Sequence, residues 1–87
     1  LFELGCLLAE KGEDSLAYEA FMKLGEEEPG GRLSPFALEK AGEIKEKFLD
    51  FSAASSIYEK AILRYPGSVV VPEIREKLNE LRRKVRS

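Results

Sequence analysis

The sequence predicts an all-α fold in which antiparallel helix hairpins repeat along the chain. Two observations support this prediction. Three residues recur 37 positions later, Ala17, Phe21 and Pro29 as Ala54, Tyr58 and Pro66. A shared offset at three positions indicates a repeat, and an offset of this size is typical of stacked helix pairs. Apolar residues also recur every three or four positions in five segments, which is the spacing of an amphipathic helix.

The first hairpin is expected from two segments joined at Gly12. Residues 1–11 have leucines at helical spacing, Leu4, Leu7 and Leu8. Gly12 ends this helix, because glycine adopts the left-handed conformation without strain. The next helix begins at Glu13 or Asp14, since an acid favours the positive end of the dipole, and it ends at Pro29 and the two glycines that follow. Its apolar stripe consists of Leu16, Ala17, Ala20, Phe21 and Leu24.

The second hairpin begins at Ser34, the expected N-cap, with Pro35 as the first helical residue. The apolar stripe of this helix consists of Ala37, Ala41, Ile44 and Phe48. Asp50 is the expected N-cap of the fourth helix, which ends at residues 65–68. The stripe of the fourth helix consists of Phe51, Ala54, Ile57, Tyr58, Ala61 and Ile62.

A fifth helix opens at Pro72, which follows Pro35 by the same 37 residues. Its stripe consists of Ile74, Leu78, Leu81 and Val85. The short apolar run Val69–Val71 is expected to pack under a turn rather than to form a strand. One domain is therefore expected, with a first repeat at 1–31, a second at 35–68 and a capping helix at 72–86. Because the chain begins inside a predicted helix without Met, we expect it to be a piece of a longer protein.

Composition excludes several function classes. A net charge of −2 argues against general nucleic-acid binding, and no run of 18 apolar residues predicts a membrane span. The basic residues near the C-terminus are interspersed with acids, and cations there favour the helix dipole. Cys6 lies among leucines in a chain with no His, so a thiol nucleophile is not expected. We expect neither an enzyme nor a metal or cofactor site, since the consecutive carboxylates of Glu26–Glu28 point in different directions on a helix.

These residues resemble the tetratricopeptide repeat over nearly the whole chain. The first repeat matches at Leu4, Gly5, Leu8, Ala17, Phe21, Leu24 and Pro29, and the second at Ala41, Gly42, Lys45, Ala54, Tyr58, Ala61 and Pro66. The resemblance implies a solenoid in which Gly5 and Gly42 allow close helix approach and the aromatic residues fill the wedges. Lys45 replaces a usual aromatic residue, which suggests a looser contact. Asn79 and Arg82 depart from the pattern with polar side chains, so the last helix is expected to be a polar cap of the array.

The 37-residue offset exceeds the usual family period of about 34. The extra residues fall in the turns at 31–35 and 68–72. Such turns resemble those of long-turn tetratricopeptide proteins of the bacterial envelope, in the Tol–Pal system and in outer-membrane barrel assembly. The resemblance implies a bacterial protein of the periplasm or cytoplasm, with the periplasm favoured.

By the same resemblance, the first helix of each repeat lines a concave groove. The residues expected there are Phe2, Cys6, Ala9, Glu39, Glu43 and Glu46. They lack the Lys and Asn of the clamp that binds chaperone C-termini, so that function is rejected. A groove with an apolar and an acidic end suits an extended or helical segment with basic and apolar residues. The alternatives are that the glutamates form a solvated face and that Phe2 and Cys6 pack against a missing preceding repeat.

The leading functional hypothesis is therefore a protein-interaction scaffold that binds a peptide or a partner subunit. A second hypothesis is a structural segment that forms a homodimer through the apolar N-terminal face. A third is a regulatory appendage of a larger enzyme.

Overall fold

A computed structural model describes residues 2–27 and 31–86, and the regular elements in these ranges are all helices. In chain order they are α1 (Phe2–Glu10), α2 (Asp14–Glu27), α3 (Ser34–Lys47), α4 (Phe51–Arg64) and α5 (Val71–Arg86). The predicted all-α fold of five helices is confirmed. Pro29 and Gly30, which were expected to end the second helix, lie outside the described residues.

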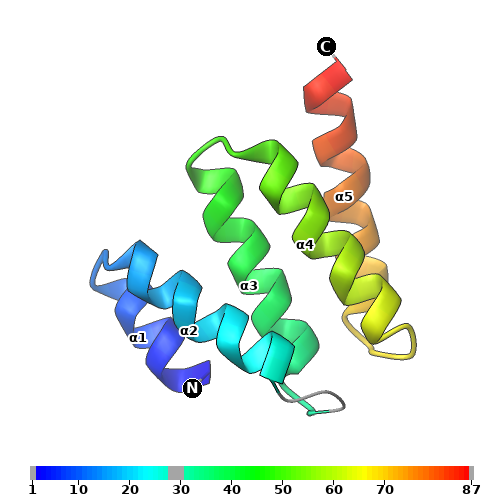
Figure 1. Cartoon of the computed structure of the whole chain (residues 1–87). Coiled ribbons are helices and arrows are strands. Elements are labelled where there is room, and N and C mark those ends of the chain that lie inside the picture. The colour runs from blue at the N-terminus through cyan, green and yellow to red at the C-terminus, as the bar shows by residue number, and fades with distance from the viewer. Residues whose placement is uncertain (1, 28–30, 87) are drawn as a thin grey trace.

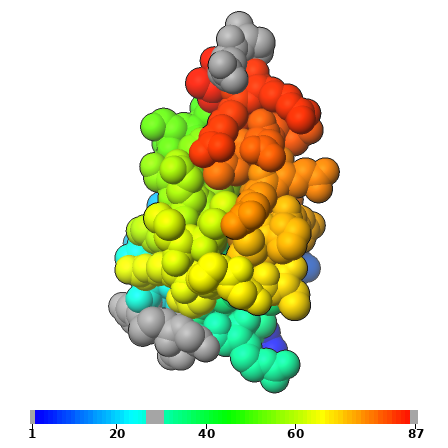
Figure 2. Space-filling view, turned by 90° about the vertical axis from the view of Figure 1, so that its right-hand side faces the viewer, coloured from blue at the N-terminus to red at the C-terminus, as the bar shows by residue number. Residues whose placement is uncertain are grey.

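The helices follow one another across the molecule in chain order, from α1 at one end to α5 at the other (Figure 1). Each helix packs extensively against the next one in sequence. The molecule measures 35 × 30 × 16 Å, so it is a flat array rather than a bundle around one centre. Figure 2 faces the end of the array, where the orange and red atoms of α5 lie beside α4.

The repeated positions form the core. The side chains of Phe21 and Tyr58 are 1% and 0% exposed, and the alanines at 17 and 54 are fully buried. The stripe predictions are wrong for Leu16, Phe48 and Val85, which are largely exposed. Leu16 lies in the first turn of α2, Val85 in the last turn of α5, and Phe48 directly after the end of α3.

Two glycines allow the close helix approach that the sequence suggested. A Cβ atom on Gly5 would lie 2.6 Å from Cε1 of Phe21, and one on Gly42 would lie 2.3 Å from Cε1 of Tyr58. Each aromatic ring therefore packs directly on a helix backbone within its own hairpin. Gly25, which the pattern did not single out, plays the same part between α2 and α3, since its Cβ would meet Leu38 at 2.5 Å.

Gly42→Ala is expected to lower the free energy of unfolding by about 1–3 kcal/mol, because an added methyl group forces apart a packed ring and a helix backbone. Denaturant unfolding followed by circular dichroism measures this loss. Gly67→Ala is the matched control, since a Cβ there meets nothing within 4 Å. Equal stabilities of the two variants would contradict the close contact of Tyr58 with α3.

The turns inside the two hairpins have the same backbone structure. Gly12 and Leu49, which stand 37 residues apart, both have positive φ, at 82° and 62°. The amide after each one bonds five residues back, Glu13 N to Leu8 O at 2.8 Å and Asp50 N to Lys45 O at 2.9 Å. The repeat therefore extends to backbone hydrogen bonds, although Leu49 lacks the glycine that this conformation favours.

The helix ends include one confirmed cap and one correction. The side chain of Asp50 accepts from Ala53 N at 3.2 Å, so it caps α4 as expected. Ser34 is not an N-cap, because α3 begins at Ser34 itself with Leu33 at the cap position. Its hydroxyl instead donates to Leu24 O at 3.2 Å, and the Tyr65 hydroxyl donates to Gly25 O at 2.9 Å. These two side chains satisfy carbonyls in the last turns of α2, which a helix leaves without partners of its own.

The connection before α5 packs largely as predicted. Val70 and Val71 are buried, whereas Val69 is 85% exposed and does not pack under the turn. Helix α5 begins at Val71, one residue before Pro72.

Candidate functional site

Glu39 is a buried carboxylate of α3 that lies near a lysine of α5. Its side chain is buried, and Oε2 has no hydrogen-bond partner within the described residues. Lys77 on α5 places Nζ 4.0 Å from that oxygen. Burial, followed by the charges of the Glu73 and Glu43 carboxylates, raises the pKa of Glu39 to about 7 against the opposing charge of Lys77. Glu39 is thus partly protonated at neutral pH.

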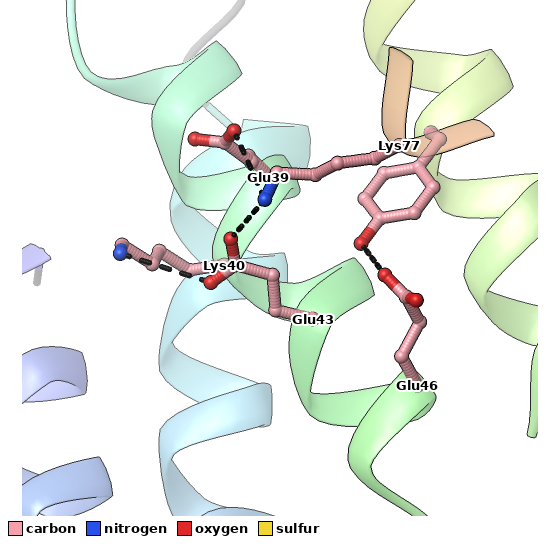
Figure 3. Close-up of polar contacts among 6 residues, drawn as sticks. Glu39, Lys40, Glu43, Glu46 and Lys77 are labelled. Atoms are coloured by element: carbon pink, nitrogen blue, oxygen red, sulfur yellow. Dashed lines mark hydrogen bonds and ion pairs between the residues drawn. The ribbon is translucent and has the colours of Figure 1, made fainter. Parts of the chain in front are cut away.

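Glu43 forms the close ion pair of this contact. Its Oε2 lies 2.9 Å from Nζ of Lys77, while its Oε1 lies 3.7 Å from Nζ of Lys40 on its own helix. In Figure 3 the Lys77 side chain reaches across from α5 to both glutamates of α3. The hydrogen bond that Lys77 donates to Glu43 raises the pKa of the lysine, although burial acts in the opposite direction. Lys77 therefore stays charged and ties α5 to α3.

Glu46 accepts a hydrogen bond from the Tyr58 hydroxyl (Figure 3). Burial of the ring, followed by this bond and the charge of Glu46, holds the pKa of Tyr58 well above its ordinary value. The phenol is therefore a permanent donor, and the contact joins α3 to α4 within one hairpin.

These contacts change the interpretation of the three glutamates. A solvated face is the wrong description for Glu39, which is 6% exposed. Glu43 and Glu46 are half-buried and bind Lys77 and Tyr58. The periodicity placed the three residues on one helix but could not reveal that α5 supplies a cation to them. That a partner contacts them remains a prediction.

Lys45 also differs from expectation. Its Nζ lies 4.4 Å from the centroid of the Tyr18 ring on α2. A cation over an aromatic face is an attractive contact, so the position is packed rather than loose.

The residues at the apolar end divide between the core and a surface hollow. Phe2 is half-buried with its ring 5.6 Å from that of Phe21, so it covers the core. Cys6 and Ala9 line a hollow of about 380 Å³ between α1 and α3. The remaining lining residues are Glu10, Asp14, Phe21, Lys40, Glu43, Ile44 and Lys47.

The hollow has an apolar floor and a charged rim. Cys6, Ala9, Phe21 and Ile44 supply the floor, and each of them is buried or half-buried. On the rim, Nζ of Lys47 pairs with Asp14 at 2.9 Å. Residue spacing alone did not predict this hollow, although the family resemblance implied that Cys6 and Ala9 line a groove. The signal that could have found it is the 37-residue offset, which pairs the small Cys6 and Ala9 with the larger Glu43 and Glu46.

Within residues 2–27 and 31–86 there is no cluster of His, Cys, Asp or Glu arranged to hold a metal ion. No helix in that part of the chain combines the length and the apolar character that a membrane crossing requires.

The chain is thus an all-helical, repeat-like protein, and its small hollow lies between α1 and α3, the first helix of each hairpin. Comparison with known proteins gives no match, whether to a family model, a curated protein or a solved structure.

Proposed function

We propose that this chain is a protein-interaction module of the tetratricopeptide-repeat type, which binds a peptide segment in the hollow between α1 and α3. The observation that carries the proposal is the hollow itself, about 380 Å³ in volume with Cys6 and Ala9 on its floor. An apolar floor with a few polar groups around it is typical of sites that bind small or extended ligands. Its position on α1 and α3 is the one that the family resemblance implies for partner binding.

The size of the hollow limits what it can hold. A volume of about 380 Å³ lies near the lower end of ligand pockets, so it suits one or two side chains of a segment rather than a whole domain. A helical or extended peptide would lay its apolar side chains on the floor and its polar groups against the rim.

Filling the hollow is expected to abolish peptide binding. A displayed library of random 12-residue peptides serves as the probe, and enrichment on the immobilised chain is the measurement. Ala9→Trp places an indole in the hollow, whereas Ser15→Trp adds the same side chain on an exposed position of α2. Peptides enriched on the wild type and on Ser15→Trp should be lost on Ala9→Trp. Enrichment that survives Ala9→Trp would place binding elsewhere.

Self-association is the second candidate, because one observation favours it. Leu4 and Leu7 on α1 are each 48% exposed, whereas Ala41 and Ile44, which stand 37 residues later, are buried. Sedimentation velocity over a concentration range separates the two functions. A species that stays monomeric at every concentration would exclude the homodimer.

A further inference from the structure

The 37-residue offset allows the two contacts on the face of α1, α3 and α5 to be compared position by position. Lys40 corresponds to Lys77 in this comparison. Three further pairs correspond, Cys6 with Glu43, Ala9 with Glu46 and Phe21 with Tyr58. The contact between α3 and α5 therefore shows what an occupied version of the hollow between α1 and α3 looks like.

The contact between α3 and α5 is completed by the chain's own side chains. Lys77 Nζ meets the carboxylate of Glu43 at 2.9 Å, and the lysine side chain is 29% exposed. The Tyr58 hydroxyl binds Glu46. Glu43 thus neutralises Lys77, and Glu46 is engaged by the Tyr58 hydroxyl.

The hollow between α1 and α3 lacks both acids. Cys6 and Ala9 stand in their places, with shorter side chains and no charge, and the space is open. Lys40 lies on this hollow with its side chain 44% exposed. Its ion pair is with Glu43, 3.7 Å away on its own helix, which is longer than a charge-assisted hydrogen bond. In Figure 3 the end of the Lys40 side chain points away from Lys77, toward the side of α1.

Two of the three acids that line the hollow are already bound by lysines of the chain itself. Asp14 is bound by Lys47 at 2.9 Å, and Glu43 is bound by Lys77 at 2.9 Å. A lysine or arginine from a partner would therefore compete with close internal pairs at Asp14 and Glu43, which leaves the exposed Glu10 as the third acid of the lining. A carboxylate from a partner would meet Lys40, whose internal pair is the longer one.

Building on the proposed function, we propose that the bound peptide carries an acidic side chain that pairs with Lys40, next to apolar side chains that fill the space over Cys6 and Ala9. The partner's side chains take the places over Cys6 and Ala9 that the side chains of Glu43 and Glu46 take in the contact between α3 and α5. The contacts within the chain thus favour an acidic and apolar segment, in place of the basic and apolar segment that the glutamates alone suggested.

The test uses the same displayed library of random 12-residue peptides, followed by affinities of synthetic peptides from the selection. Peptides enriched on the wild type should share an Asp or Glu next to apolar residues. Changing that acid to its amide, or Lys40→Gln in the protein, should each weaken binding about tenfold or more. The two changes together should cost little more than either alone, since they remove the same pair. Lys23→Gln, at an exposed lysine on α2, should leave binding unchanged.

Cys6→Glu provides an independent variant, because it gives Lys40 the internal carboxylate that Glu43 gives Lys77. It should suppress binding as strongly as Lys40→Gln while thermal melts show a folded chain. Enriched peptides without an acid, or acidic peptides whose binding survives Lys40→Gln, would overturn this inference and leave the proposed function standing. A library that yields no enrichment on the wild type would overturn both.

Discussion

Tyr58→Ala is expected to lower the free energy of unfolding by about 3–5 kcal/mol, the range for loss of a buried aromatic side chain. The ring is 0% exposed and lies directly on the backbone of α3 at Gly42. Its removal leaves a cavity between two helices and takes the hydroxyl donor away from Glu46. A domain of 87 residues has a total stability of roughly 4–13 kcal/mol, so this loss is a large fraction. Urea unfolding at neutral pH measures it.

Tyr58→Phe separates the ring from its hydroxyl. It should cost only about 1 kcal/mol, because Glu46 is half-buried and can turn toward water. The first hairpin already has this arrangement, with Phe21 in the place of Tyr58 and Ala9 in the place of Glu46. If Tyr58→Ala and Tyr58→Phe both had the same urea midpoint of unfolding as the wild type, the ring would not fill the space between α3 and α4.

Glu39→Gln is expected to stabilise the protein at pH 8 and to have little effect near pH 4.5. The pKa of Glu39 rises from 4.5 to about 7 on folding, because burial and the carboxylates of Glu73 and Glu43 disfavour its charge. Between these two values the folded state keeps a proton that the unfolded state has released, so stability falls as the pH rises. Above about pH 7 the full cost is present, on the order of 1–3 kcal/mol. The amide carries no charge at any pH, so the variant avoids this cost.

The measurement is urea unfolding of the wild type and of Glu39→Gln at several pH values from 4.5 to 8. The matched control is Glu80→Gln, at an exposed glutamate that pairs with Arg83 on α5. The difference between Glu39→Gln and the wild type should grow with pH, whereas the control should show no such growth. A difference for Glu39→Gln that stays constant across the range would contradict a raised pKa.

The local architecture was predictable because its causes lie close together in the sequence. The offset that relates Phe21 to Tyr58 predicted the two hairpins, and both aromatic rings are buried in them. Gly12 marked a left-handed turn, and Asp50 marked a helix start, because each depends on the conformation of a few neighbouring residues. The candidate site was predictable to the extent that Cys6 and Ala9 line a hollow on the expected helix.

Contacts between helices were not predictable in the same way. Whether Lys77 reaches Glu43, or Ser34 reaches Leu24, depends on the angle and register between two helices. A periodic pattern gives the buried face of each helix but does not give either quantity. For the same reason the pattern could not show that Phe48 and Val85 remain exposed.

The packing of each helix against the next in sequence also has a consequence for dynamics. Contacts between residues close in sequence form with little loss of chain entropy, so we expect folding in the microsecond-to-millisecond range of helical proteins. A linear array also opens from its ends, since each terminal helix has a partner on one side. Amide hydrogens of α3, the central helix of the array (Figure 1), should therefore exchange most slowly. Those of α1, which borders the hollow, should exchange early, and a bound peptide would slow them.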